Sequence, residues 1–189
     1  MNFKLILPLL ALCAFVFSCD VESDSVAEAQ ERNEEILKSE QLEEDAEYLT
    51  EFAYDLMLSN NVAKTMDGRT ENDSVRNFVT TVLQDNEKIE QAMQRVAKEH
   101  NIMLPQKLDT DAMETIHDFQ TADVDNIDEK YLEWFVDHTK DAREDINEII
   151  AETNKTESIL QLANLIATQQ FVHIELANRM LPRLASYEY

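Results

Sequence analysis

The chain has 189 residues, 39 of them acidic and 16 basic, so its formal net charge is −23. This charge repels nucleic acids and anionic membrane surfaces, and an electrostatically attracted partner would be a metal ion, a polyamine or a basic protein. Because 44% of the residues are hydrophobic and regularly spaced, the acidity indicates the surface of one folded domain rather than a disordered chain.

Residues that bend or cross-link the backbone are scarce. Gly68 is the single glycine, proline occurs three times, and the two cysteines are Cys13 and Cys19. Hairpin turns and dinucleotide-binding loops need glycine, so the composition excludes most β and Rossmann-type folds. With no cysteine after Cys19 and no serine in a glycine-flanked turn, the sequence offers neither a disulfide framework nor nucleophilic catalytic machinery.

The N-terminus predicts export. Lys4 precedes an apolar run, Leu5 to Phe17, that is too short to span a membrane, so residues 1–18 are predicted to be a signal peptide. Val16-Phe17-Ser18-Cys19 resembles the lipobox of bacterial lipoproteins, which implies a lipid on Cys19. We therefore expect a protein anchored to the outer membrane of a bacterial cell envelope, facing the periplasm or the exterior. Plain secretion and an uncleaved anchor are the alternatives. The acidic residues after Cys19, beginning with Asp20, resemble an inner-membrane retention signal of some bacteria and a surface-export signal of others.

Residues 19–45 form an acidic stretch. Between Asp20 and Glu47 the sequence has twelve acidic residues, two basic ones and few apolar ones. Like charges repel and extend a chain, so the stretch is predicted to be a solvated tether that turns helical towards its end.

From residue 46 to residue 185, apolar residues recur at steps of three and four, the spacing of amphipathic helices. The first helix is predicted to end at Gly68, which would take the left-handed cap. The second begins at Asn72 or Asp73 and ends near Asn101, before Pro105.

A shorter amphipathic segment, Asp109 to Gln120, is predicted to be a connector helix. The third long helix opens at Asn126, with Glu129 as its reciprocal capping partner, and the fourth follows residue 156 and ends at Pro182. The sequence therefore predicts an all-α protein, a four-helix bundle with a short connector helix between helices 2 and 3.

One polar residue stands near the middle of each long apolar stripe. These are Asn60, Asn86, His138 and His173. In a bundle they can form one polar core layer, with neutral histidines bonded to the amides or to water. The alternative is a mononuclear site in which His138 and His173 hold a transition metal ion together with a carboxylate. The carboxylate candidates are Asp85, Asp137 and Glu175.

The di-iron motif of ferritin-like bundles is missing. That motif supplies a glutamate three residues before each histidine. Here Phe135 and Gln170 stand three residues before His138 and His173, and neither can provide an anionic ligand.

Three stretches carry a family resemblance. They are Val75-Arg76-Asn77-Phe78 through Asp85 to Leu104-Pro105, Asp128-Glu129-Lys130-Tyr131-Leu132 through Asp137-His138, and Leu162-Ala163 through His173. In this order they resemble DUF4142, a ferritin-like family of bacterial envelope proteins of unknown function. The resemblance implies a ferritin-like helical fold and an envelope location.

The departures from that family concern its polar positions. The first-helix glutamate of the family corresponds to Asn60, and the Asp-His of its second helix corresponds to Asp85-Asn86. The Leu-Pro before its last histidine reads Ala167-Thr168. His138 and His173 match, but two polar partners are amides, so the resemblance implies weak metal binding or none.

Two hypotheses about function follow. The first is a lipid-anchored envelope protein with a binding or structural role, no cofactor, and an envelope protein as a partner. The second is a metal-binding, ferritin-like protein with a protective or redox role centred on His138 and His173. Neither predicts nucleic-acid binding, and the oligomeric state is left open.

Overall fold

The computed structural model describes residues 25–151 and 155–184, and all their regular structure is helical. In chain order the elements are α1 (Ser25–Ile36), α2 (Glu40–Asp67), α3 (Asp73–His100), α4 (Thr110–Thr121), the 3-10 turn η1 (Val124–Asn126), α5 (Ile127–Ala151) and α6 (Glu157–Leu184). The all-α prediction is confirmed. The predicted signal peptide and Cys19 lie outside the described residues.

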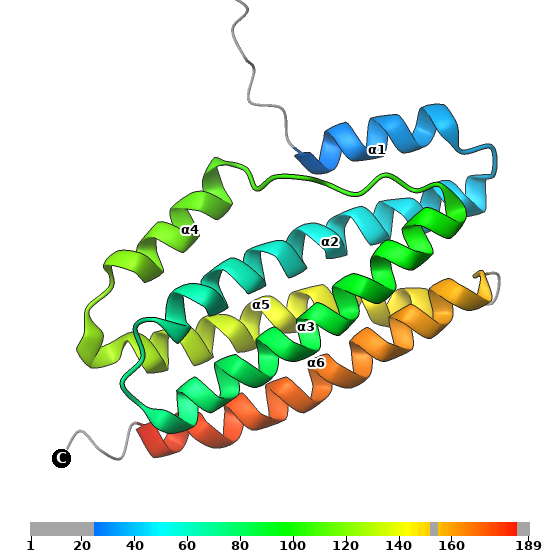
Figure 1. Ribbon diagram of the computed structural model, residues 1–189. Helices are drawn as coiled ribbons and strands as arrows, with labels where there is room; N and C mark the ends of the chain where they lie inside the picture. Colours follow the sequence, from blue (N-terminus) through cyan, green and yellow to red (C-terminus); the bar gives the residue numbers. More distant parts are fainter. Residues whose placement is uncertain (1–24, 152–154, 185–189) are drawn as a thin grey trace, which may run out of the picture.

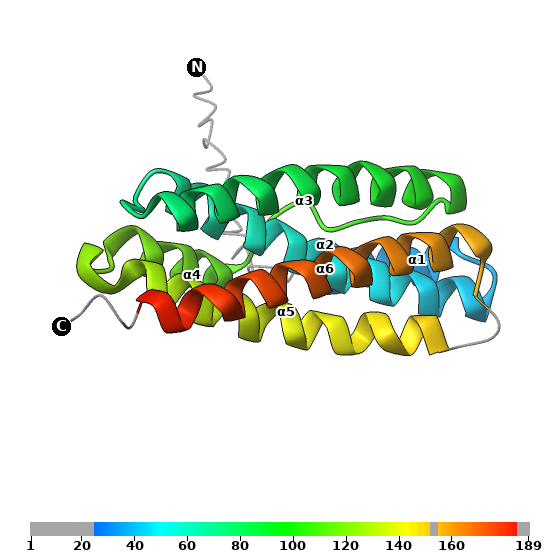
Figure 2. The same cartoon turned by 90° about the horizontal axis from the view of Figure 1, so that it is seen from below.

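The four long helices lie side by side (Figure 1, Figure 2). Helix α2 contacts α3 and α5, and α6 contacts the same two helices from the other side, so the four contacts close a ring. The shorter α1 and α4 pack on the outside of α2, and a linker of residues 101–109 joins α3 to α4 along this side (Figure 1). None of the described helices is both long enough and apolar enough to cross a lipid bilayer.

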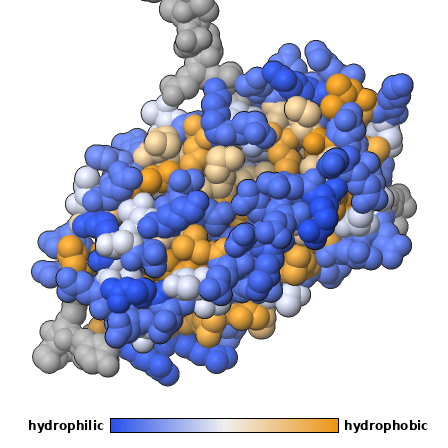
Figure 3. Space-filling model, viewed as in Figure 1, coloured by the Kyte–Doolittle hydropathy of each residue, from blue (hydrophilic) through white to orange (hydrophobic). Residues whose placement is uncertain are grey.

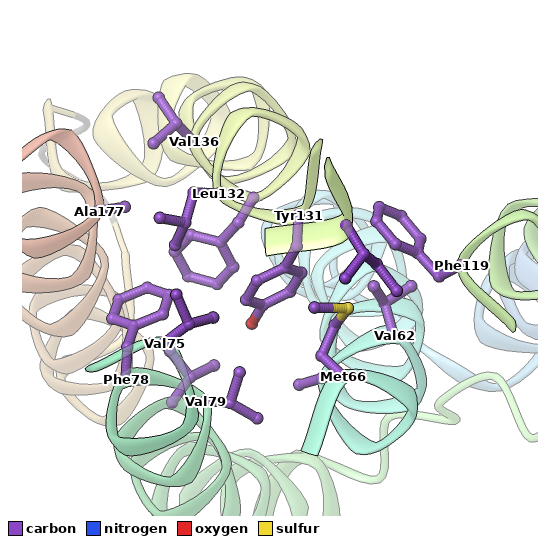
Figure 4. Close-up of a cluster of buried hydrophobic side chains, with 14 of the residues drawn as sticks. Val62, Met66, Val75, Phe78, Val79, Phe119, Tyr131, Leu132, Val136 and Ala177 are labelled. Atoms are coloured by element: carbon purple, nitrogen blue, oxygen red, sulfur yellow. The ribbon is translucent and has the colours of Figure 1, made fainter. Parts of the chain in front are cut away.

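The hydrophobic core has two parts, one towards each end of the long helices. The first surrounds Tyr131 and Phe119, with Met66 and Val75 beside them (Figure 4). The second includes Leu49, Ile89 and Ile166 among others. Figure 4 shows the hydroxyl oxygen of Tyr131 pointing into the middle of the first cluster, and this oxygen has no hydrogen-bond partner among the described residues. Burial raises the pKa of this hydroxyl above its ordinary value.

Side-chain caps define the starts of α3 and α4. The Asn72 side chain accepts hydrogen bonds from the backbone N–H groups of Ser74 and Val75, at 2.9 and 3.4 Å, as predicted for the second long helix. Asp109 accepts from the N–H of Ala112 at 2.8 Å and caps the connector helix.

The left-handed capping residue was predicted to be Gly68, at the end of the first long helix, but in the structure it stands at the end of α3. Gly68 has a φ of −84°, in the right-handed region. The left-handed residue is Asn101, with a φ of 59°, at the end of α3. Asparagine tolerates this conformation better than other non-glycine residues do, so α3 ends without a glycine.

Two further boundaries differ from the sequence prediction. Asn126 lies inside the helical turn η1, so it does not have the extended conformation expected of an N-cap residue. Asp123 instead caps this turn by accepting from the N–H of Asp125 at 3.3 Å. Helix α6 continues through Pro182 to Leu184, because Leu181 and Leu184 still pack against the first core cluster.

From Ser25 onward the acidic stretch is not the solvated tether that we expected. It forms α1, which packs on α2. Asn33 is 2% exposed and binds both backbone groups of Met103 in the linker: Nδ2 donates to the carbonyl oxygen at 3.0 Å, and Oδ1 accepts from the N–H at 2.7 Å. Ser25 Oγ accepts from the N–H groups of Gln106 and Lys107 at 3.2 and 3.3 Å. Helix α1 is therefore fastened to the α3–α4 linker by buried polar contacts.

Replacing Asn33 with alanine is expected to detach α1. The change removes two hydrogen bonds and leaves the N–H and C=O of Met103 unpaired, which costs about 2 kcal/mol. Amide hydrogen exchange of α1 should accelerate about 30-fold, while exchange in α5 and α6 stays unchanged. The matched control is Asn178→Ala, because Asn178 is exposed on α6. Equal exchange rates of α1 in both variants would show that these bonds do not hold it.

Candidate functional site

A small cavity lies between the two core clusters, where the four long helices face one another. Its volume is about 30 Å³, and a buried water needs about 10–15 Å³. Each long helix contributes to its lining. The polar residues that line it are Asp55 and Ser59 of α2, Asn86 of α3, His138 and Thr139 of α5, and Gln169, Gln170 and His173 of α6.

His173 is the most buried of these polar residues, at 2% exposed. Its ring packs edge-on against Phe78 and Phe135, and its Nε2 lies 3.1 Å from Oδ2 of Asp85 on α3. Burial lowers the pKa of His173 below its ordinary 6.5, and the hydrogen bond and charge of Asp85 offset this only in part. At neutral pH the ring is therefore uncharged, and its Nε2–H donates to Asp85.

Asp85 also faces a lysine. Lys88 Nζ lies 2.7 Å from Oδ1 of Asp85, one turn further along α3. Burial alone would raise the pKa of Asp85, but the hydrogen bonds from Lys88 and His173 outweigh it and hold the pKa below its ordinary value. The carboxylate stays ionised and fixes the orientation of the His173 ring.

His138 also lines the cavity and is half-buried. Its ring stacks on Trp134 with centroids 4.8 Å apart and an angle of 11° between the planes. Its Nε2 lies 3.3 Å from the backbone carbonyl oxygen of Asp55 on α2. A carbonyl oxygen can only accept, so Nε2 is the donor in this contact.

The two amides of the predicted layer bind each other. Asn86 Nδ2 donates to Asn60 Oδ1 at 2.9 Å, which joins α3 to α2. Asn86 lines the cavity, whereas Asn60 lines a groove on the outer side of the same helix pair. The structure thus brings Asn86, His138 and His173 to one cavity and places Asn60 directly behind it.

Two of the three carboxylate candidates lie away from the cavity. The Asp137 side chain is 80% exposed and lies 3.8 Å from Lys140. Glu175 is 48% exposed and lies 3.7 Å from Arg179. Of the three, only Asp85 contacts a histidine of the site. Among the described residues there is no group of three or more His, Cys, Asp and Glu side chains placed to hold a metal ion.

Gln170 is a buried residue of the site that the sequence prediction did not include. It is 8% exposed, it lines the cavity, and its Oε1 has no hydrogen-bond partner among the described residues. Ser59 and Thr139 add two buried hydroxyl groups. The signal was present, since Gln170 stands one helical turn before His173 and so shares its buried face.

The chain resembles known proteins in sequence and in fold. The family model described as Domain of unknown function (DUF4142) matches residues 27–180. No curated protein matches the chain. Among solved structures, the chain is similar to a DUF305 fragment from Deinococcus radiodurans, with a TM-score of 0.66 and 12% sequence identity over 74% of this chain and 96% of that one. At this identity the likeness shows the fold alone. Because the family model spans most of its length, the chain belongs to the DUF4142 family.

Proposed function

We propose that the protein is a lipid-anchored component of the bacterial cell envelope that has a binding or structural role rather than a catalytic one. The observation that supports this most directly is the lipobox-like Val16-Phe17-Ser18-Cys19, which lies just before the folded part. Residues 19–24 separate the proposed lipid from the start of α1, and six extended residues span about 20 Å. A lipid on Cys19 would therefore hold α1 close to the membrane surface.

Metabolic labelling tests the anchor. The full chain, expressed in a bacterium fed with radiolabelled palmitate, is expected to incorporate label and to fractionate with membranes. Cys19→Ala should abolish both effects, whereas the matched control Cys13→Ala, inside the predicted signal peptide, should keep both. A wild-type chain without label would contradict the proposal.

A second candidate function is metal binding. It is favoured by one observation: His138 and His173 reach the same cavity from α5 and α6, next to the unpaired Oε1 of Gln170. The site would supply two imidazoles together with side-chain oxygens from the lining, which includes Asp55 as well as the neutral Gln170, and two imidazoles suit a transition metal better than calcium or magnesium.

Elemental analysis separates the two candidates. The full chain, purified without chelator or affinity metal, is compared with the double variant His138→Ala, His173→Ala. Under the first proposal, neither protein carries stoichiometric metal. Near-stoichiometric iron, manganese, zinc or copper in the wild type, lost in a variant that remains helical, would establish the second candidate instead.

A further inference from the structure

A surface groove runs between α2, α3 and the α3–α4 linker. It has a volume of about 340 Å³, within the range of about 300–1,000 Å³ that small-ligand sites have. Its floor is apolar. The residues that form this floor are Ala53, Leu56, Met57, Met93, Leu104 and Pro105. Figure 3 shows hydrophobic atoms gathered in the band between α1 and α3, where this groove lies.

The floor of the groove suits aliphatic side chains of varying shape. Met57 and Met93 contribute from the two helices that face each other across the groove. Thioether side chains are flexible and polarisable, so they adapt to different apolar groups. Leu104 and the buried Pro105 close the groove along the linker.

Carboxamide side chains border the groove on all three of its walls. Asn60 and Asn61 stand on α2, Gln94 stands on α3, and Gln106 stands on the linker. Each carboxamide both donates and accepts hydrogen bonds, as a peptide group does. Each of the four already makes one hydrogen bond within the protein: Asn60 accepts from Asn86, and Asn61, Gln94 and Gln106 donate to Met57, Glu90 and Leu104. The donor and acceptor positions that remain on these side chains complement a ligand that contains an amide.

One charge of each sign lines the groove, on opposite walls. Lys64 belongs to α2 and Glu90 to α3, and both are exposed. Within the described part of the chain neither side chain forms an ion pair, and Glu90 accepts only a hydrogen bond from Gln94 at 3.2 Å. On a chain with a net charge of −23, a cation and an anion that line the same groove complement a zwitterion rather than a simple cation.

We propose that this groove binds a short peptide with apolar side chains and free termini. Its ammonium group faces Glu90, its carboxylate faces Lys64, its side chains rest on the apolar floor, and its peptide group meets the carboxamides. The proposal names a ligand class for the binding role and does not depend on the lipid anchor, because the groove lies wholly within the folded residues.

Calorimetric titration with dipeptides tests the proposal on the purified full chain. Leucyl-leucine is the probe, and its N-acetylated form and its C-terminal amide each lack one terminal charge. The wild type is expected to bind leucyl-leucine about fivefold more tightly than either derivative, because an exposed ion pair contributes up to about 1 kcal/mol.

Two variants test which side chain of the groove binds each terminus of the peptide. Glu90→Gln should remove the preference over the acetylated peptide only, and Lys64→Gln should remove the preference over the amide only. The matched controls Glu87→Gln and Lys98→Gln replace exposed charges of α3 outside the groove and should keep both preferences. The proposal is overturned by a folded wild type that binds none of the three peptides. It is also overturned by binding that neither variant changes. Either result leaves the labelling test of the lipid anchor unaffected.

Discussion

Replacing Asp45 or Lys155 with alanine is expected to lower the free energy of unfolding by about 3–5 kcal/mol, because either change leaves the other residue charged and buried. Both side chains are 0% exposed, and Lys155 Nζ lies 2.9 Å from Oδ1 of Asp45. The same ammonium lies 5.0 Å from the centre of the Tyr48 ring. This pair joins the segment just before α6 to the first half of α2, so its loss should also loosen the end of the structure that holds the second core cluster.

Urea denaturation at neutral pH measures this effect. The double variant Asp45→Leu, Lys155→Met replaces the pair with apolar groups and is expected to recover most of the lost stability. The matched control is Lys140→Met, which breaks a surface pair with Asp137 and should cost less than about 1 kcal/mol. Single variants of the buried pair that unfold at the same urea concentration as the control would show that the pair contributes little.

Replacing His173 with alanine is expected to cost about 3 kcal/mol and to flatten the acid side of the stability profile. The change enlarges the cavity, removes the ring that packs on Phe78 and Phe135, and takes away the hydrogen bond to Asp85. Lys88 remains to pair with the carboxylate of Asp85, so no charge is left without a partner.

The pH dependence follows from the direction of the His173 shift. Its pKa is lower in the folded protein than its ordinary 6.5, so unfolding takes up a proton in the interval between the two values. The contribution of His173 is complete above about pH 6.5 and is lost as the pH falls through the folded pKa. The pKa of Asp85 is lowered from 3.8, so its own contribution disappears only at more acidic pH.

Unfolding free energies measured from pH 7.5 down to pH 5 check this. The wild type should lose stability below pH 6.5, and His173→Ala should lose less over the same range. His117→Ala, which removes an exposed histidine of α4, should follow the wild-type curve. A wild-type profile without a slope in this range would contradict a buried neutral His173.

The sequence by itself determined the long helices and which of their faces are buried. Apolar steps of three and four residues fix a face of a helix regardless of its neighbours, so residues such as Val79 and Ile166 are buried where the pattern put them. The cap Asn72 acts on backbone groups two or three residues away, and it too was predicted locally. Asp109 was predicted only as the first residue of the connector segment, and the structure makes it the cap of that helix.

Contacts between distant residues were decided only by the tertiary structure. Asn33 binds a backbone 70 residues away, and Lys155 pairs with Asp45, which stands 110 residues earlier (155 − 45). Asn33 stands four residues from the buried Ala29 and Leu37, but nothing local identifies the backbone of Met103 as its partner. Burial of such groups depends on a partner that only the folded chain supplies, and the acidic composition around Asn33 favoured a tether instead.

For the candidate site, too, the sequence decided one part of the arrangement and the tertiary structure decided the other. Periodicity placed Asn86, His138 and His173 on inward faces, and the helix packing then brought them to one cavity. Asp137 and Glu175 stand one and two residues from those histidines, and each residue turns the side chain by about 100° around the helix. That rotation carries both carboxylates to the surface. Asp85 reaches His173 from another helix, because the packing of α3 against α6 sets which side chains meet.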